Sequence, residues 1–180
     1  MRLPPVHITT VLDHEALRAL YGDARVFSWA GPADEPRFSV SAFGNESGPH
    51  WHYVVLGTRD VIGCELSFRL AAGSIEDISS APRWPAVLLQ QLAKLAQRSG
   101  RLPNIGGYLC FEAPLDPHGE VRCVALVGDP QLPDTLQAVG LHEDELPLMS
   151  EDDYPRLLGA LEERAPLWVT EPRRAPIRLD

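Results

Sequence analysis

The feature that most constrains the fold is the stretch of residues 50–70, HWHYVVLGTRDVIGCELSFRL, which holds the densest run of strand-forming residues in the chain. Side chains alternate between the two sides of a strand, and both sides of residues 50–56 are largely apolar, which is typical of an interior strand. Turn residues at 57–60 interrupt the run. Residues 64–70 resume it with one apolar face and a polar face of Glu65, Ser67 and Arg69. The pattern predicts two neighbouring strands, the second with its polar face in water.

Shorter patterns predict the remaining elements. Helices are expected at 13–21, at 84–99, where apolar residues including Val87 and Leu95 repeat at helical spacing, and at 151–163. Further strands are expected at 25–29, 37–43, 108–112, 121–127, 136–141 and 167–170. Strands and helices do not alternate regularly. We therefore predict an α+β fold, a mixed, mostly antiparallel β-sheet packed against two or three α-helices, in a single domain of residues 1–180.

Composition limits the classes of partner. The chain carries a formal charge of -9 and has one lysine, Lys94, whereas phosphate binding needs clustered cations, so we expect no nucleic acid partner. Its apolar runs are far shorter than the roughly 20 residues that span a bilayer. The first ten residues, MRLPPVHITT, lack the hydrophobic region of a signal peptide. We expect no membrane contact and a cytoplasmic location.

The cysteines do not suggest a disulfide framework. Cys64, Cys110 and Cys123 are odd in number, widely spaced and contain no C-x-x-C motif. This pattern favours neither paired cysteines nor a structural zinc site, and Cys110 lies in the apolar context of a strand. We predict three reduced thiols that are buried.

Possible catalytic groups are sparse. His50 and His52 would share one face of a strand, as two ligands of a metal do, but no third ligand follows at a suitable spacing. Cys110 could serve as a nucleophile only with a base brought near by the fold. The acidic clusters at 143–145 and 151–153 are more simply a solvated surface. We predict no catalytic residue, no metal and no cofactor, and keep as the alternative a metal- or thiol-dependent hydrolase using these residues.

Several motifs occur in one order along the chain. They are H-W-H-Y at 50–53, G-x-x-D at 57–60, G-x-E-L-S-F-R-L at 63–70, W-P-A at 84–86, P-L-D at 114–116, D-P-Q at 129–131, and W-V-T at 168–170 leading to Arg173 and Arg174. In these motifs the chain resembles the suppressor of fused family, over about residues 38–175. The resemblance identifies as signatures of the fold His50, Trp51, His52, Tyr53, Trp84, Asp129 and Trp168.

The resemblance implies a non-catalytic protein-binding module. Animal members hold an extended peptide as an added strand between two lobes, a mode that uses main-chain hydrogen bonds for affinity. Their long insertion before the G-x-E-L motif is reduced here to Val61 and Ile62. Compact bacterial members resemble immunity proteins, so we expect an intracellular protein partner such as a basic toxin, which the acidic surface would attract. Candidate partner contacts are Asp60, Glu65, Arg69, Arg173 and Arg174.

Overall fold

The computed structural model describes residues 15–22, 26–29, 38–45, 48–72, 80–102, 105–116, 119 and 121–179. Its strands are β1 (Val26–Trp29), β2 (Ser39–Asn45), β3 (His50–Leu56), β4 (Glu65–Ala71), β5 (Tyr108–Cys110), β6 (Val121–Gly128) and β7 (Thr135–His142). Its α-helices are α1 (Glu15–Tyr21), α2 (Arg59–Ile62), α3 (Trp84–Ser99) and α4 (Tyr154–Arg164), and its 3-10 helices are η2 (Glu143–Leu148) and η3 (Pro166–Trp168).

The strands form one seven-stranded sheet in the order β1-β2-β3-β4-β7-β6-β5. Only the central β4–β7 pair is parallel, while the other neighbouring pairs are antiparallel. The predicted α+β fold with a mixed, mostly antiparallel sheet is confirmed. The predicted pair of strands at residues 50–70 lies near the centre of the sheet, and β5 forms one of its two edges.

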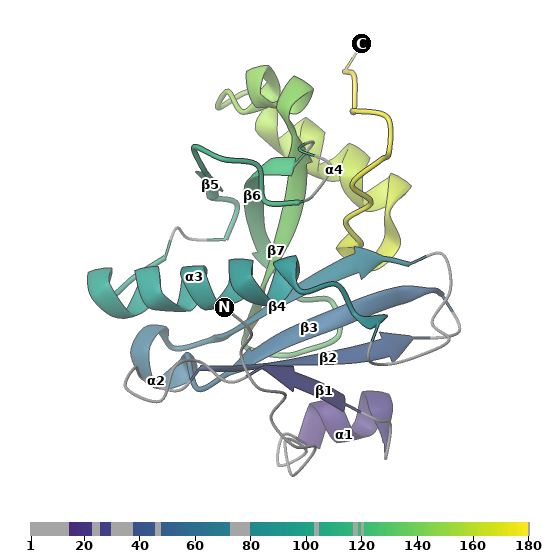
Figure 1. Cartoon of the computed structure of the whole chain (residues 1–180). Helices are drawn as coiled ribbons and strands as arrows, with labels where there is room; N and C mark the ends of the chain where they lie inside the picture. The colour runs from purple at the N-terminus through teal and green to yellow at the C-terminus, as the bar shows by residue number, and fades with distance from the viewer. Residues whose placement is uncertain are drawn as a thin grey trace.

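Helices cover both faces of the sheet (Figure 1). Helix α3 packs on one face, where Tyr53, Phe68 and Leu126 belong to the largest apolar core. On the other face α4 packs on β6 and β7, and Leu17 of α1 packs against Phe43 of β2. The described helices are too short, or too polar, for any of them to cross a lipid bilayer.

Helix α3 begins as predicted, with Pro85 in its first turn, where the missing N–H of proline costs no hydrogen bond. Its buried face differs from the predicted one, because Val87 and Leu95 are 39% and 41% exposed. The buried residues are Pro85, Ala86, Leu88, Leu89, Leu92, Ala93 and Ala96. The buried face thus includes three alanines, which a pattern built on large apolar residues overlooks.

The prediction of a wet face on β4 is wrong. Glu65, Ser67 and Arg69 are all buried, with Arg69 at 0% exposure. Polar groups of neighbouring segments cover this face and hydrogen-bond to it, so water is not needed to satisfy these side chains.

The prediction of three reduced, buried thiols is also wrong. Cys110 on β5 and Cys123 on β6 form a disulfide, and Cys110 lies in an exposed position. Their spacing in the sequence carries no disulfide signal, because the pairing arises from the register of β5 against β6. Cys64 is a free cysteine and is half-buried.

Two further segments differ from expectation. The predicted turn at residues 57–60 overlaps the short helix α2 (Arg59–Ile62), which ends at Gly63 with a φ of 79°, a conformation that favours glycine. The last predicted strand is the 3-10 helix η3 followed by a single bridge between Thr170 and Leu70.

Candidate functional site

A buried polar cluster lies at the centre of the sheet face opposite α3. Asp129 directly follows β6, and its carboxylate accepts hydrogen bonds from both terminal nitrogens of Arg69, each at 3.0 Å. It also accepts one from the Ser67 hydroxyl at 2.6 Å and one each from the backbone N–H groups of Gln131 and Leu132. Burial by itself would raise the pKa of Asp129, but the hydrogen bonds from His52 and Arg69 and the charge of Arg69 outweigh it and hold the pKa well below its usual range.

Both terminal nitrogens of Arg69 have acceptors, while its buried Nε has none. Its guanidinium donates to the side-chain oxygen of Gln137 and, at 3.0 Å, to that of Gln131, besides its two bonds to Asp129. Both charged side chains are 0% exposed. A buried pair with this many hydrogen bonds is costly to break, because removing one partner leaves the other charge unpaired in a medium that solvates it poorly.

His52 connects this cluster to α1. The Tyr21 hydroxyl lies 2.7 Å from its Nδ1, and Asp129 Oδ2 lies 3.4 Å from its Nε2. Complete burial lowers the pKa of His52 to about 4, and the interaction of its Nε2 with the Asp129 carboxylate opposes this only in part, so the ring is neutral at pH 7. Burial likewise raises the pKa of Tyr21 to about 12. The histidine of this Tyr21–His52–Asp129 chain is closed to solvent, and its hydrogen bond with Tyr21 links α1 to the sheet.

The residues of the hydrolase alternative do not converge. His50 is buried, and its Nδ1 donates to the backbone oxygen of Gly48 at 2.5 Å. Cys110 has no thiol in the disulfide form. In the described part of the chain, no three side chains of the His, Cys, Asp or Glu type lie close enough together to hold a metal ion.

Three of the five predicted partner-contact residues have structural partners inside the protein, namely Arg69, described above, Glu65 and Arg174. Glu65 accepts hydrogen bonds from the backbone N–H and the hydroxyl of Thr58, which precedes α2. Arg174 makes a two-pronged ion pair with Glu145 in which both side chains are at most 3% exposed. Glu145 is therefore not part of a solvated acidic surface, as its cluster predicted, because it also accepts hydrogen bonds from the backbone of His142 and Ile177.

The remaining two candidates are exposed but far apart. Asp60 lies on α2, near the end of the β6–β7 pair at which Gly128 and Leu136 are opposite each other. Arg173 lines a polar cavity of about 280 Å³ at the other end of that pair, together with His142, Glu143 and Asp144. The fold thus does not bring the five predicted residues together, and their contact with a partner stays a prediction.

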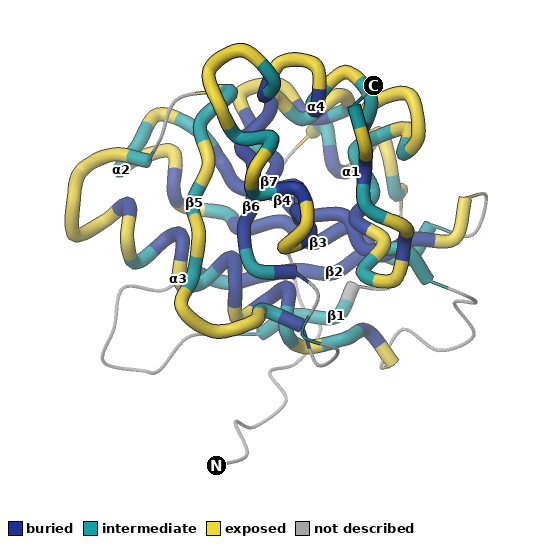
Figure 2. Tube along the Cα trace, turned by 90° about the horizontal axis from the view of Figure 1, so that it is seen from above, coloured by how far each residue is buried: buried dark blue, intermediate teal, exposed yellow. Residues whose placement is uncertain are grey.

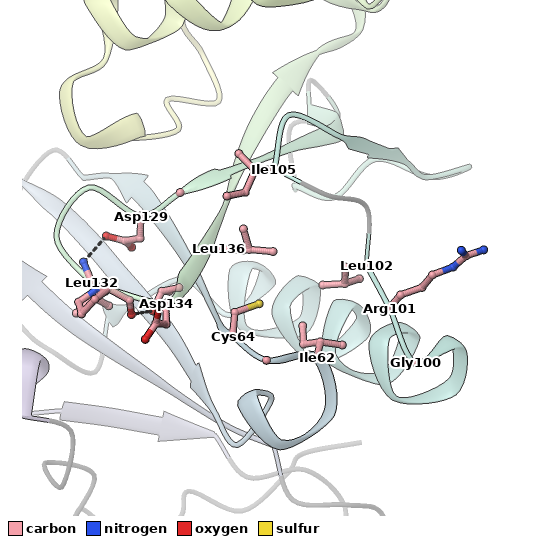
Figure 3. A pocket seen from close by; sticks show the side chains of 14 residues that line it. Ile62, Cys64, Gly100, Arg101, Leu102, Ile105, Asp129, Leu132, Asp134 and Leu136 are labelled. Atoms are coloured by element: carbon pink, nitrogen blue, oxygen red, sulfur yellow. Dashed lines mark hydrogen bonds between the residues drawn. The ribbon is translucent and has the colours of Figure 1, made fainter.

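A larger cavity opens beside the first of these ends (Figure 3). It has a volume of about 570 Å³ and lies between α2, the end of α3 and the β6–β7 loop. Its lining is mainly apolar and includes Ile62, Leu102, Ile105, Leu132 and Leu136. Charged residues in its lining are Arg101, Asp129 and Asp134, and Asp134 lies 3.7 Å from the guanidinium of Arg59. Ile105 is 71% exposed, an unusual position for a large apolar side chain at a cavity mouth.

The sheet edge β5 starts next to this cavity, three residues after Ile105. Backbone hydrogen bonds to β6 lie on either side of β5. The carbonyl oxygen of Gly107 accepts one from the N–H of Leu126 at 2.8 Å, and the N–H of Phe111 donates one to the carbonyl oxygen of Arg122 at 3.0 Å. In an antiparallel pair, residues whose backbone groups bond to the partner strand alternate with residues whose backbone groups point away from it. The N–H and C=O groups of Tyr108 and Cys110 therefore face away from β6. Among the described residues no strand pairs with this outer side. Figure 2 shows β5 as a mostly exposed segment at the border of a buried sheet.

Sequence reasoning missed this region. Ile105 and Leu102 stand in a loop without periodicity, and Leu136 was expected only as a strand residue. An isoleucine among turn residues, next to Gly106 and Gly107, is the one signal that could have pointed to an exposed apolar position.

Comparisons with known proteins agree with the fold. The family model of the suppressor of fused protein matches residues 34–175. The suppressor of fused homologs of human and mouse are each 29% identical to the chain over 178 aligned positions, which cover 72% of this chain and 36% of the relative. The chain thus spans about a third of the length of these relatives.

A solved structure gives the same overall picture. A protein from Neisseria gonorrhoeae described as a suppressor of fused homolog superposes with a TM-score of 0.72, covering 92% of this chain and 94% of that one at 13% identity. At this identity the likeness concerns the fold alone. Together with the family match, it follows that the chain belongs to the suppressor of fused family, as its motifs predicted, and the family supports a protein-binding module.

Proposed function

We propose that this chain is a non-catalytic, intracellular module that binds an extended segment of a protein partner along the outer edge of β5. The observation that carries the proposal is a strand edge with which no described strand pairs, together with an apolar cavity at its beginning. Backbone groups of an edge strand pair with any extended chain, whereas a neighbouring pocket selects the side chain that enters it.

The geometry fits a short contact of this kind. The outward backbone groups of Tyr108 and Cys110 offer main-chain hydrogen bonds, and Tyr108 is 45% exposed. The cavity beside Ile105 has room for a large apolar side chain of the segment. A few such anchors usually supply most of the affinity of an interface.

Charge favours a basic partner. The formal net charge of -9 would attract a positively charged protein and speed its encounter with this one, an effect that weakens with salt. A secreted or injected toxin with a basic surface fits this requirement, so we propose an immunity-like role in which binding neutralises the toxin. Asp60, beside the cavity, is the predicted partner-contact residue best placed to take part.

The proposal is tested by capture with a tagged chain from a lysate of the native organism, at low and moderate salt. The wild type should retain one basic protein, with less of it at moderate salt. Replacing Ile105 by alanine should reduce the retained amount by about tenfold, because it removes an exposed apolar anchor.

Leu20→Ala is the matched control, since Leu20 is also an exposed large apolar residue, but it lies on α1 near the opposite edge of the sheet. It should capture as much as the wild type. Equal capture by the Ile105→Ala and Leu20→Ala variants would refute the proposed site, and no captured protein at either salt would refute the binding role.

A further inference from the structure

The Cys110–Cys123 disulfide has an unequal environment on its two sides. Cys110 lies on the exposed edge strand, whereas Cys123 is 0% exposed and belongs to the core under α4. The two residues are directly opposite each other in the register of β5 and β6, with a Cα–Cα distance of 4.1 Å. A reagent from solution can therefore approach this bond from the Cys110 side.

The disulfide joins β5 to β6 at a position where few other interactions hold β5. Cys110 and Cys123 form a pair without mutual backbone hydrogen bonds, since the bonds fall on the flanking residues. The strand is only three residues long, and Leu109 is the one residue of it that packs on the main core. On the other face Tyr108 meets the ring of Tyr154 at 5.8 Å. The covalent bond is thus a main restraint on the position of this edge.

A disulfide in a reducing compartment is usually transient and sensitive to redox conditions. From its accessibility and its place in the edge strand, we propose that Cys110–Cys123 is a reversible redox site, reduced by a dithiol, whose state controls the order of β5. The oxidised form holds the strand edge in place, and the reduced form loosens it.

The exchange requires one dithiol for each disulfide. A thiolate of the dithiol attacks the sulfur of Cys110, the bond between the two protein sulfurs breaks, and Cys123 leaves as a thiolate that takes up a proton. The second thiolate of the reagent then attacks the mixed disulfide and releases Cys110, which is protonated in turn. Two electrons and two protons pass to the protein, and the reagent becomes a disulfide.

This redox site would regulate the binding proposed above, and that consequence rests on the proposed function. A partner strand along β5 and the disulfide both favour the ordered edge. By linkage, oxidation strengthens partner binding and a bound partner protects the disulfide from reduction.

Hydrogen exchange on the purified protein tests the redox site without a partner. Alkylation and mass spectrometry should find one free thiol, that of Cys64, before treatment with dithiothreitol and three after it. The amides of Gly106 and Phe111, which donate to β6, should exchange about tenfold faster or more in the reduced form, because local opening becomes easier. Amides of β1, the other sheet edge, should not change.

Two variants sharpen the result. A Cys110→Ser/Cys123→Ala double variant should exchange like the reduced protein in both conditions, and a Cys64→Ser variant should behave like the wild type. Unchanged exchange of the Gly106 and Phe111 amides on reduction, or a disulfide that dithiothreitol leaves intact in the folded protein, would overturn the inference. Either result is independent of whether a partner is captured.

Discussion

Replacing Asp129 by asparagine tests the role of the buried polar cluster. The substitution keeps the size of the side chain but removes the charge that neutralises Arg69, and it turns an N–H₂ group or a weaker acceptor toward the guanidinium. Both side chains are 0% exposed, so water cannot replace the lost interaction. Breaking a buried pair in this way costs about 3–5 kcal/mol, which for a domain of this size lowers the melting temperature by about 6–20 °C.

Asp134→Asn is the matched control. Asp134 also faces an arginine, Arg59, at 3.7 Å, but the two side chains are 72% and 44% exposed. Asparagine tolerates the positive φ of 51° at this position, so only the surface ion pair is lost, at a cost of about 1 kcal/mol or less. Urea unfolding of both variants at pH 7, followed by circular dichroism, measures the difference. Equal losses of stability would refute the claim that burial makes the Arg69–Asp129 pair decisive.

Two other changes have clear signs. His52 has a pKa of about 4 in the folded protein and an ordinary pKa of 6.5, so the unfolded chain binds more protons between these two values. The free energy of unfolding should therefore fall by up to about 3 kcal/mol as pH drops from 6.5 to 4. In urea unfolding a His52→Gln variant should lack most of this decrease, and an equal decrease in the variant would contradict the assignment. A Gly140→Ala variant should lose about 1–3 kcal/mol of stability in thermal unfolding, because the new Cβ would lie 2.6 Å from Cγ2 of the buried Thr170. Gly128→Ala, with open space around the new Cβ, should stay near the wild type. Equal stability of the two variants would show that Thr170 can move aside without cost.

Local patterns predicted the elements but not their partners in space. Alternation and turn residues placed β3, β4, β6 and β7 within a few residues, and Pro85 with Gly100 marked the limits of α3. Glu65, Ser67 and Arg69 were expected to face water because the alternation of polar and apolar residues along a strand shows which side chains are polar, not which are buried. Glu65 bonds to the nearby Thr58, but Ser67 and Arg69 are covered by Asp129, and Arg69 also by Gln137, which lie 60 or more positions away. No local rule contains these distant contacts.

The candidate site was predicted less well than the fold. Its edge strand was expected, but its cavity is built from α2, the end of α3 and the β6–β7 loop, which meet only through the sheet order. The disulfide was missed for the same reason, since it depends on the register that places Cys110 opposite Cys123. The signature histidines and Asp129, by contrast, were identified from the family motifs. The contact of His52 with Tyr21 and that of Asp129 with Arg69 explain physically why such residues suit the centre of this fold.

Hydrogen exchange on the complex with the captured partner tests the central claim most directly. The proposed strand addition predicts slower exchange at residues 105–111, where the outward amides of Tyr108 and Cys110 gain partners, and unchanged exchange at β1, the opposite edge of the same sheet. Protection at β1, or at the cavity beside Arg173 with β5 unaffected, would contradict binding along β5.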